Sequence, residues 1–383
     1  MSDILFGADR LEEYKDLFKN KRIGLITSPT GVLSDLSSTI DAFYSLFDLE
    51  AMFAPEHGVR GEHQDGASID YYLDKKTGKP VYSIYGTKRE PSISELSDID
   101  ILVYDIQDVG SRYYTFLYSM TNSMLKAKER GIPFVVLDRP NPIGGLNPEG
   151  SPLQDSNKSF IGMYNYPQRF SLTPGEFAFM VNKEQRIGAD LFVIPMKNWT
   201  RNMYYCEIGK PWINPSPNIA SFESIVLYNG TCFFEGTNIS EGRGTTRPFE
   251  FIGAPWLDGY EYAERLNYYN LEGVKFRPIS FIPMFNKHSG QVCNGVQVHV
   301  MDYKKVKPVI VGLVMLKEAM LLGGDHFQFT VPKHEIGDYT IDLLFGSDSI
   351  RKSFDLDELR YKIEKYSIEY KKRFLEYWIY PER

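Results

Sequence analysis

Between residues 49 and 61 the chain reads LEAMFAPEHGVRG. Its first five residues form an apolar run that predicts a buried strand, and the proline and glycines after them predict a loop. Open α/β sheets bind ligands at the carboxyl ends of their strands. The carboxyl group of Glu56, the imidazole of His57 and the guanidinium of Arg60 are therefore candidates for chemistry. The alternative is a strand-end turn in which Glu56 and Arg60 pair only with each other.

Strand and helix patterns alternate through the first half of the chain. Further apolar runs predict strands over residues 22–27, 80–86, 101–106, 134–137 and 191–194, and helical patterns cover 39–47, 113–130 and 174–185. Near-continuous apolar strands between helices predict a parallel sheet covered on both faces, a Rossmann-like α/β architecture. The first strand is followed by TSPTG and not by GxGxxG, which argues against a dinucleotide site.

The pattern changes after about residue 200. Strand-like segments at 274–277 and 295–300 and helices over 309–322 and 356–377 predict a smaller α+β domain. We expect a Rossmann-like domain over residues 1–200, a second domain over 201–383, and an active-site cleft between them.

Net charge, apolar runs and the N-terminal sequence limit the binding partners and the cellular compartments that we expect. The net charge of −7 argues against nucleic-acid binding, and no apolar run is long enough for membrane insertion. The N-terminus lacks the features of a secretory signal, so the sequence as written predicts a cytoplasmic protein. A periplasmic or extracellular location would follow if a signal has been removed.

Polar side chains gather where strands are predicted to end. Asp105, Gln107, Asp108, Arg112 and Tyr113 follow the fourth strand. Further polar groups follow the fifth strand or lie in two Pro- and Gly-rich stretches of the second domain: Arg139, Asn141, Asn218, Glu235, Asn238, Glu241, Arg243, Thr245 and Arg247. Glycine permits close backbone approach to a ligand, and arginine offers a planar fork to a carboxylate. The alternative is a set of turns with solvated charges.

Metal-site patterns are weak. His57 and His63 have five residues between them and do not match HExxH. Asp105 and Asp108 could hold a hard cation, but they could equally cap the following helix. We therefore expect no metal and no cofactor.

Carboxyl groups are numerous enough for glycoside hydrolysis, which commonly uses one as proton donor and a second as nucleophile or base. Glu56 is the candidate proton donor. The candidate partners are Asp105, Asp108, Glu235 and Glu241.

Six motifs together resemble one family, the exo-β-N-acetylmuramidases of the NamZ type. They are APEHGVRG (54–61), YGTK (85–88), DIQDVGSRYYT (105–115), VLDRPNPIGG (136–145), PSPN (215–218) and FFEGTNISEGRGTTRPFEFIGAPW (233–256). The resemblance implies a Rossmann-like domain, a smaller C-terminal domain and a cleft between them. It also implies release of N-acetylmuramic acid from the non-reducing end of peptidoglycan fragments, with Glu56 as the catalytic glutamate of the PEHG motif.

The implied substrate, a muramyl glycan, carries a lactyl carboxylate. Arg60, Arg112, Arg243 and Arg247 are available to pair with it, and aromatic side chains at Tyr113, Tyr114 and Trp256 could stack on a sugar. The expected substrate-binding residues are His57, Arg60, Gln107, Arg112, Tyr113, Arg139, Asn141, Asn218, Asn238, Arg243, Thr245 and Arg247.

Two other functions stay open at this point. The protein could be a non-catalytic binding protein for sugars or muropeptides, or a metal-dependent hydrolase of an ester or amide.

Overall fold

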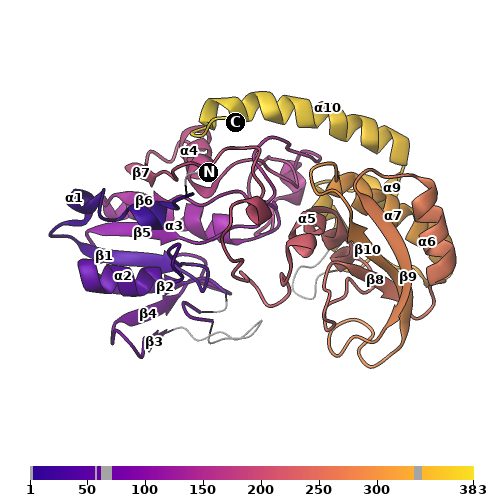
Figure 1. Ribbon diagram of the computed structural model, residues 1–383, viewed down its shortest axis with the longest axis horizontal. Helices are drawn as coiled ribbons and strands as arrows, with labels where there is room; N and C mark the ends of the chain where they lie inside the picture. Colours follow the sequence, from indigo (N-terminus) through magenta and orange to yellow (C-terminus); the bar gives the residue numbers. More distant parts are fainter. Residues whose placement is uncertain (1–2, 57, 62–70, 332–338) are drawn as a thin grey trace.

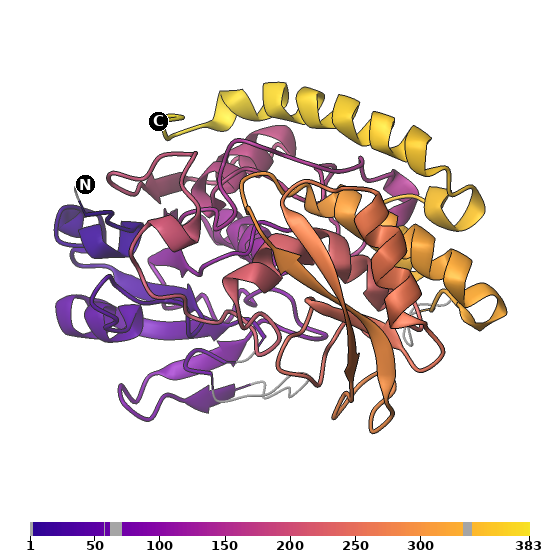
Figure 2. The ribbon, with the colours of Figure 1, turned by 45° about the vertical axis from the view of Figure 1, so that its right-hand side comes forward.

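The structure is a computed structural model that describes residues 3–56, 58–61, 71–331 and 339–383. Two units, each built around its own sheet, lie side by side, and the long helix α10 (Leu356–Phe374) crosses over both (Figure 1 and Figure 2). No helix of the described residues is both long enough and apolar enough to cross a membrane.

The first unit contains a seven-stranded sheet in the order β3-β4-β2-β1-β5-β6-β7. Numbered along the chain, its six parallel strands run 3-2-1-4-5-6, which is the Rossmann order, and so the predicted architecture is confirmed. The antiparallel edge strand β3 was not predicted. The strands are β1 Arg22–Thr27, β2 Asp48–Ala54, β3 Tyr71–Leu73, β4 Pro80–Ser83, β5 Ile101–Asp105, β6 Phe134–Leu137 and β7 Leu191–Ile194.

Helices cover both faces of this sheet, as the apolar strands require. On one face α2 (Thr39–Leu46) buries Ile40 and Phe43 against β1 and β2. On the other face α3 (Phe116–Arg130) and α4 (Pro174–Glu184) pack against β5 and β6. Helix α4 begins with a capping box in which the side chains of Thr173 and Glu176 each accept a backbone N–H.

Helix α3 begins at Phe116, three residues later than predicted. The preceding segment is held in a different way, because Ser111 forms a β-bridge with Arg169 and the Arg112 N–H donates to the carbonyl of Gln168 at 2.7 Å. These contacts with a distant loop replace the first helical turn that the local pattern predicts.

The second unit is built around an antiparallel sheet in the order β8-β10-β9. Its apolar core includes helices α5 and α7, which approach so closely that a Cβ on Gly230 would lie 1.8 Å from the carbonyl oxygen of Pro308. Its elements are β8 Phe251–Ala254, β9 Val274–Phe281, β10 Cys293–Val300, α5 Phe222–Thr231, α6 Gly259–Tyr268, α7 Pro308–Gly323, α8 Thr340–Phe345 and α9 Ser349–Lys352. A short helix, α1 (Lys15–Phe18), precedes β1 in the first unit.

Helix α10 belongs to both cores. Leu359 and Ile363 pack in the core of the second unit, whereas Tyr370 and Phe374 pack in the core of the first. The C-terminal end of the chain thus packs against the first unit. The domain boundary at residue 200 remains a proposal.

Candidate active site

The loops after β1, β2, β5 and β6 lie at one edge of the parallel sheet. The Thr27 hydroxyl donates to the Asp105 carbonyl at 3.0 Å, and the Gln107 N–H donates to the Thr30 hydroxyl at 3.0 Å, so the loops after β1 and β5 are in contact. Glu56 is half-buried two residues beyond β2. A Cβ on Gly61 would lie 3.2 Å from Cγ of Pro29, so the Glu56 loop adjoins the loop after β1. His57 lies outside the described residues.

Asp105 and Arg139 form a buried ion pair at this edge. Nε and Nη2 of Arg139 donate to the two carboxylate oxygens at 2.6 and 2.9 Å, and the side chains are 1% and 0% exposed. The Thr39 hydroxyl donates to the same carboxylate at 2.6 Å, and Arg139 also donates to the carbonyl of Val32 at 2.8 Å. The pair therefore ties β5, β6 and the start of α2 together, and both carboxylate oxygens of Asp105 already accept hydrogen bonds.

Asp108 is placed differently from Asp105. Its Oδ1 accepts the Gly110 N–H at 2.7 Å, but its buried Oδ2 has no hydrogen-bond partner among the described residues. Burial raises the pKa of Asp108 to about 7. Asp108 is thus the predicted carboxyl group in this loop that retains an unused oxygen.

The second unit lies against this loop. Asn229 of α5 donates to the carbonyl of Gly110 at 3.4 Å, and the Tyr113 hydroxyl donates to the Asn229 carbonyl at 2.5 Å. Within the described residues, Oε1 of Gln107 and Oδ1 of Asn229 are buried without partners. In addition to Asp108, Gln107 of the first unit and Asn229 of the second unit therefore each have a buried side-chain oxygen without a partner in the described residues.

Several predicted binding residues serve the fold. Nη1 of Arg112 donates to the carbonyls of Ser151 and Tyr166, and its Nη2 donates to those of Leu344 and Phe345, all at 2.7–3.0 Å. The Asn141 amide donates to two carbonyls at 3.0 Å. Arg112 thus connects the two units, and Asn141 connects two loops of the first unit. Their positions at strand ends in the sequence did not reveal this structural role.

Arg60 also has partners inside the protein. Its Nε donates to Asp74 at 2.6 Å and its Nη2 donates to Asp41 at 3.0 Å. The alternative in which Arg60 and Glu56 pair only with each other is therefore wrong. Asp74 is 33 positions from Asp41, so only the folded chain brings both to this arginine.

The Gly-rich stretch of the second unit contains an ion-pair network. Arg243 donates to Glu235 at 2.7 Å, and Lys287 donates to the buried carboxylate of Glu241 at 2.8 Å. Burial acts to lower the pKa of Arg243, but the charges of Glu235 and Glu241 and the hydrogen bond to Glu235 together outweigh it, so the pKa is raised. Arg247 is more available, because its side chain is 47% exposed and its contacts to Glu250 are 3.4 Å long.

The remaining predicted residues of the second unit make local contacts. The Asn238 amide donates to the carbonyl of His326 at 2.7 Å, and the Thr245 hydroxyl donates to that of Gly242 at 2.6 Å. Asn218 is buried, and its N–H donates to Ser216. These contacts do not bring the side chains of Asn218, Asn238 and Thr245 together in one site.

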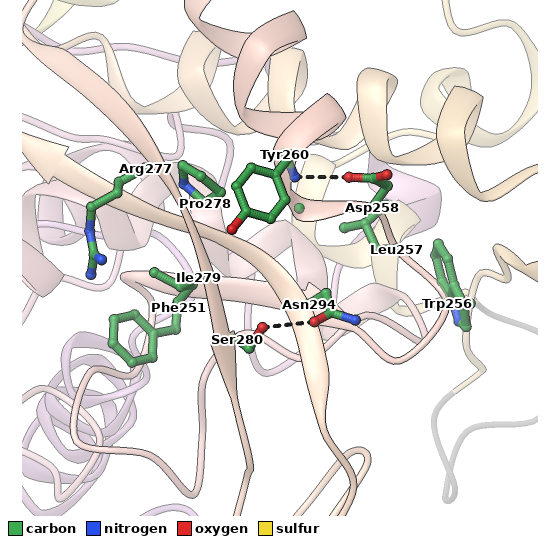
Figure 3. Close-up of a pocket in the computed structure, with 11 residues that line it drawn as sticks. Phe251, Trp256, Leu257, Asp258, Tyr260, Arg277, Pro278, Ile279, Ser280 and Asn294 are labelled. Carbon is green, nitrogen blue, oxygen red and sulfur yellow. Dashed lines mark hydrogen bonds between the residues drawn. The ribbon is translucent and has the colours of Figure 1, made fainter.

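A cavity of about 690 Å³ opens on the sheet of the second unit (Figure 3). It is lined by Trp256, one of the predicted stacking residues, and by Tyr260, which is 80% exposed. Ser280 donates to Asn294 across its floor at 2.8 Å. None of the predicted carboxyl groups lines it.

Within residues 3–56, 58–61, 71–331 and 339–383, no group of three or more His, Cys, Asp or Glu side chains is placed to hold a metal ion.

Comparison with known proteins gives consistent matches over the whole chain. The family model described as exo-beta-N-acetylmuramidase NamZ, N-terminal, matches residues 23–223, and its C-terminal counterpart matches residues 226–380. The peptidoglycan beta-N-acetylmuramidase NamZ of Bacillus subtilis (strain 168) is 47% identical over 347 residues, which cover 90% of this chain and 82% of that protein.

Two crystal structures of DUF1343 family proteins from Bacteroides fragilis NCTC 9343 are also similar. One has a TM-score of 0.90 and 35% identity, covering 99% of this chain and 100% of that chain. The other has a TM-score of 0.81 and 30% identity, covering both chains completely.

Proposed function

Since this chain belongs to the NamZ family of exo-β-N-acetylmuramidases, we infer that it is a glycosidase that removes N-acetylmuramic acid from the non-reducing end of peptidoglycan fragments. The observation that carries this conclusion is the 47% identity to a peptidoglycan β-N-acetylmuramidase over 90% of the chain. Membership in an enzyme family favours catalysis over the non-catalytic binding protein and over the metal-dependent hydrolase.

We propose that Glu56 donates the proton to the glycosidic oxygen. Its half-buried carboxyl group follows β2 at the edge where the loops after β1 and β5 meet. Protonation of the leaving oxygen allows the bond to the anomeric carbon to break through an oxocarbenium-like state. We place the catalytic cleft where these loops face α5 of the second unit.

Asp108 is our proposal for the second carboxyl group. The other candidates already form ion pairs within the protein: Asp105 with Arg139, Glu235 with Arg243, and Glu241 with Lys287. Among these four, Asp108 is the one with a fully buried carboxyl oxygen that has no partner in the described part of the chain. An ionised Asp108 would attack the anomeric carbon or activate a water molecule.

The sheet geometry supports this pairing. Strands β2 and β5 lie on either side of β1, and neighbouring strands are about 4.8 Å apart, so the two strand ends are about 10 Å apart. Glycosidases separate their two carboxyl groups by about 5–9.5 Å. Side chains that lean toward the end of β1 from both sides would reach that range.

Asp108→Asn should lower kcat at least about a hundredfold and change the pH profile. Because the pKa of Asp108 in the folded protein is about 7, the ionised form that the mechanism needs accumulates as pH rises through 7. The wild-type kcat should therefore rise over this range, and the rise should vanish in the variant. The measurement is kcat between pH 5 and 9.

Stability provides the control for this variant. A carboxyl group whose folded pKa lies above its ordinary value favours folding most below about pH 4, and that contribution is lost as pH rises to 7. Asp108→Asn removes the buried charge, so its melting temperature at pH 8 should equal or exceed that of the wild type. If kcat of Asp108→Asn falls by the same factor at every pH and still rises near pH 7, Asp108 has a structural role.

Arg247→Ala should weaken recognition of the lactyl carboxylate. Loss of a charge-assisted hydrogen bond costs about 1.5–3 kcal/mol, so kcat/KM for a chromogenic N-acetylmuramic acid glycoside should fall at least about tenfold. Turnover of the matching N-acetylglucosamine glycoside, which lacks the carboxylate, should stay low and unchanged. Failure of the wild type to cleave the muramic acid glycoside would refute the proposed function itself.

The exposed Arg277 of β9 is a matched control, since it lies in the separate cavity of Figure 3. Arg277→Ala should leave the preference between the two sugars unchanged. Equal losses on both sugars in Arg247→Ala would assign Arg247 a structural role.

A further inference from the structure

Two adjoining cavities lie at the joint between the units, below α10. Their volumes are about 620 and 470 Å³, and they share Leu146, Asn147, Arg169 and Lys304. Residues of α10 line the larger one, and α10 lies at the opposite side of the molecule from β3 and β4 (Figure 1). We call the two cavities together the α10 cavity.

The α10 cavity is rich in cations although the chain as a whole is acidic. Seven cationic side chains line it against three carboxyl groups, whereas the net charge of the chain is −7. The cations are Arg169, Arg201, Lys304, Lys305, Lys307, Lys371 and Arg383, and the carboxyl groups are Glu149, Glu272 and Glu364. A local excess of one charge in a low-dielectric recess attracts the opposite charge.

Four of these cations already have carboxylate partners. Arg201 pairs with Glu176 at 2.5 Å. The three lysines of the 304–307 segment pair with Glu207, Asp302 and Glu364 at 2.6–3.6 Å. The cations that remain are Arg169, Lys371 and Arg383, and of these Arg169 and Lys371 line the larger cavity.

Arg169 is a buried guanidinium, 4% exposed, and its hydrogen bonds within the described residues go to neutral oxygens of Ile143, Tyr204 and Val306. Its Nη2 donates to the carbonyl of Ile143 at 2.7 Å and to the Tyr204 hydroxyl at 2.9 Å, and its Nε has no partner in the same described part. A buried charge is costly unless it is paired. Arg169 therefore offers an anion an unused donor and a charge that no carboxylate neutralises by a hydrogen bond in the described residues.

Glu149 does not remove this excess. Its Oε1 accepts the Ile310 N–H at 2.9 Å at the start of α7, and its buried Oε2 is without a partner in the described chain. Burial raises the pKa of Glu149 to about 7, against the opposing charges of Arg169 and Lys307. Near neutral pH a large share of Glu149 is protonated, and in that form its hydroxyl can donate to a ligand oxygen.

We propose that the α10 cavity binds a compact organic anion that carries phosphate or carboxylate groups, with Arg169 and Lys371 as its charged contacts. Arginine suits the planar oxygens of both groups, and Lys371 approaches from α10, so the ligand would bridge the first unit and the helix that spans both. The wall also contains Leu146, Pro148 and Ile368, which would pack against a carbon skeleton. A volume of about 620 Å³ is typical of small-molecule sites.

The test is titration calorimetry of the full chain with glycerol 3-phosphate, succinate and sulfate at constant ionic strength. We expect saturable binding of glycerol 3-phosphate or succinate, tighter than that of sulfate. The better of the two identifies phosphate or carboxylate as the recognised group. Lys371→Gln should weaken this binding about tenfold or more, because one charge-assisted hydrogen bond is lost.

The neighbouring Lys372 is a matched control, because it is exposed on the same helix and does not line the cavity. Lys372→Gln should bind as the wild type does, and so should Glu56→Gln, since the site is separate from the proposed catalytic edge. Absence of saturable binding, sulfate binding as tight as the organic anions, or equal weakening by Lys371→Gln and Lys372→Gln would each overturn the proposal.

Discussion

Glu56→Gln should lower kcat on a chromogenic N-acetylmuramic acid glycoside by at least about a hundredfold, the lower end of the range for acid–base catalysis. Glutamine keeps the size and hydrogen-bonding capacity of the side chain but cannot donate a carboxyl proton to the leaving oxygen. The effect should be large with a poor leaving group and smaller with an activated phenol, which needs less protonation. Steady-state kinetics with both kinds of glycoside check this expectation.

Glu50 is a matched control on the same strand. It lies near the middle of β2, is paired with Lys79 at 3.2 Å and is 37% exposed. Glu50→Gln should retain wild-type kcat, and both variants should unfold at the wild-type urea midpoint. Wild-type turnover by Glu56→Gln would remove Glu56 from the mechanism, whatever the fate of the proposal for Asp108.

Arg139→Met should destabilise the protein by about 3–5 kcal/mol, the cost of breaking a buried ion pair by removing one partner. Arg139 and Asp105 are 1% and 0% exposed, so the variant leaves a carboxylate buried without its cation. The measurement is the free energy of unfolding from urea denaturation. Because the two residues join β5 to β6, we expect the effect on stability even where no substrate is present.

Two comparison variants distinguish this cost from a general effect of losing an arginine. Arg22 pairs with Asp98 and Asp100 at the surface, with a side chain that is 40% exposed. Arg22→Met should barely move the urea midpoint, because exposed pairs contribute little. Asp105→Leu combined with Arg139→Met should recover part of the lost stability, since neither residue is then a buried unpaired charge. Equal midpoints for Arg22→Met and Arg139→Met would contradict the assigned role.

The strands of the first unit were predictable because their signal is local. Apolar runs bounded by polar turns identified β1, β6 and β7 with the limits that the structure has, and the alternation with helices predicted the parallel sheet. β3 was missed because its three residues form an antiparallel edge of partly exposed side chains. Such an edge is stabilised by pairing with β4 and not by a buried pattern of its own.

The sequence by itself also determined which residues stand at the strand ends, and the motifs determined the family. It did not determine which of those side chains are free to react. Arg112 donates to the carbonyl of Phe345, 233 positions away, and Arg139 neutralises Asp105 from 34 positions away. Asp108 lies between Asp105 and Arg112 in the same loop, and one of its carboxyl oxygens is buried without a hydrogen-bond partner in the described residues.

The same limit applies to α10, whose apolar residues belong to two cores, and to the cavity that it closes over Arg169. Hydrophobic periodicity and turn residues act over a few neighbours along the chain, and so they specify strands, helices and loops. Ion pairs, buried hydrogen bonds and cavities depend on which distant segments meet, and only the tertiary structure decides that.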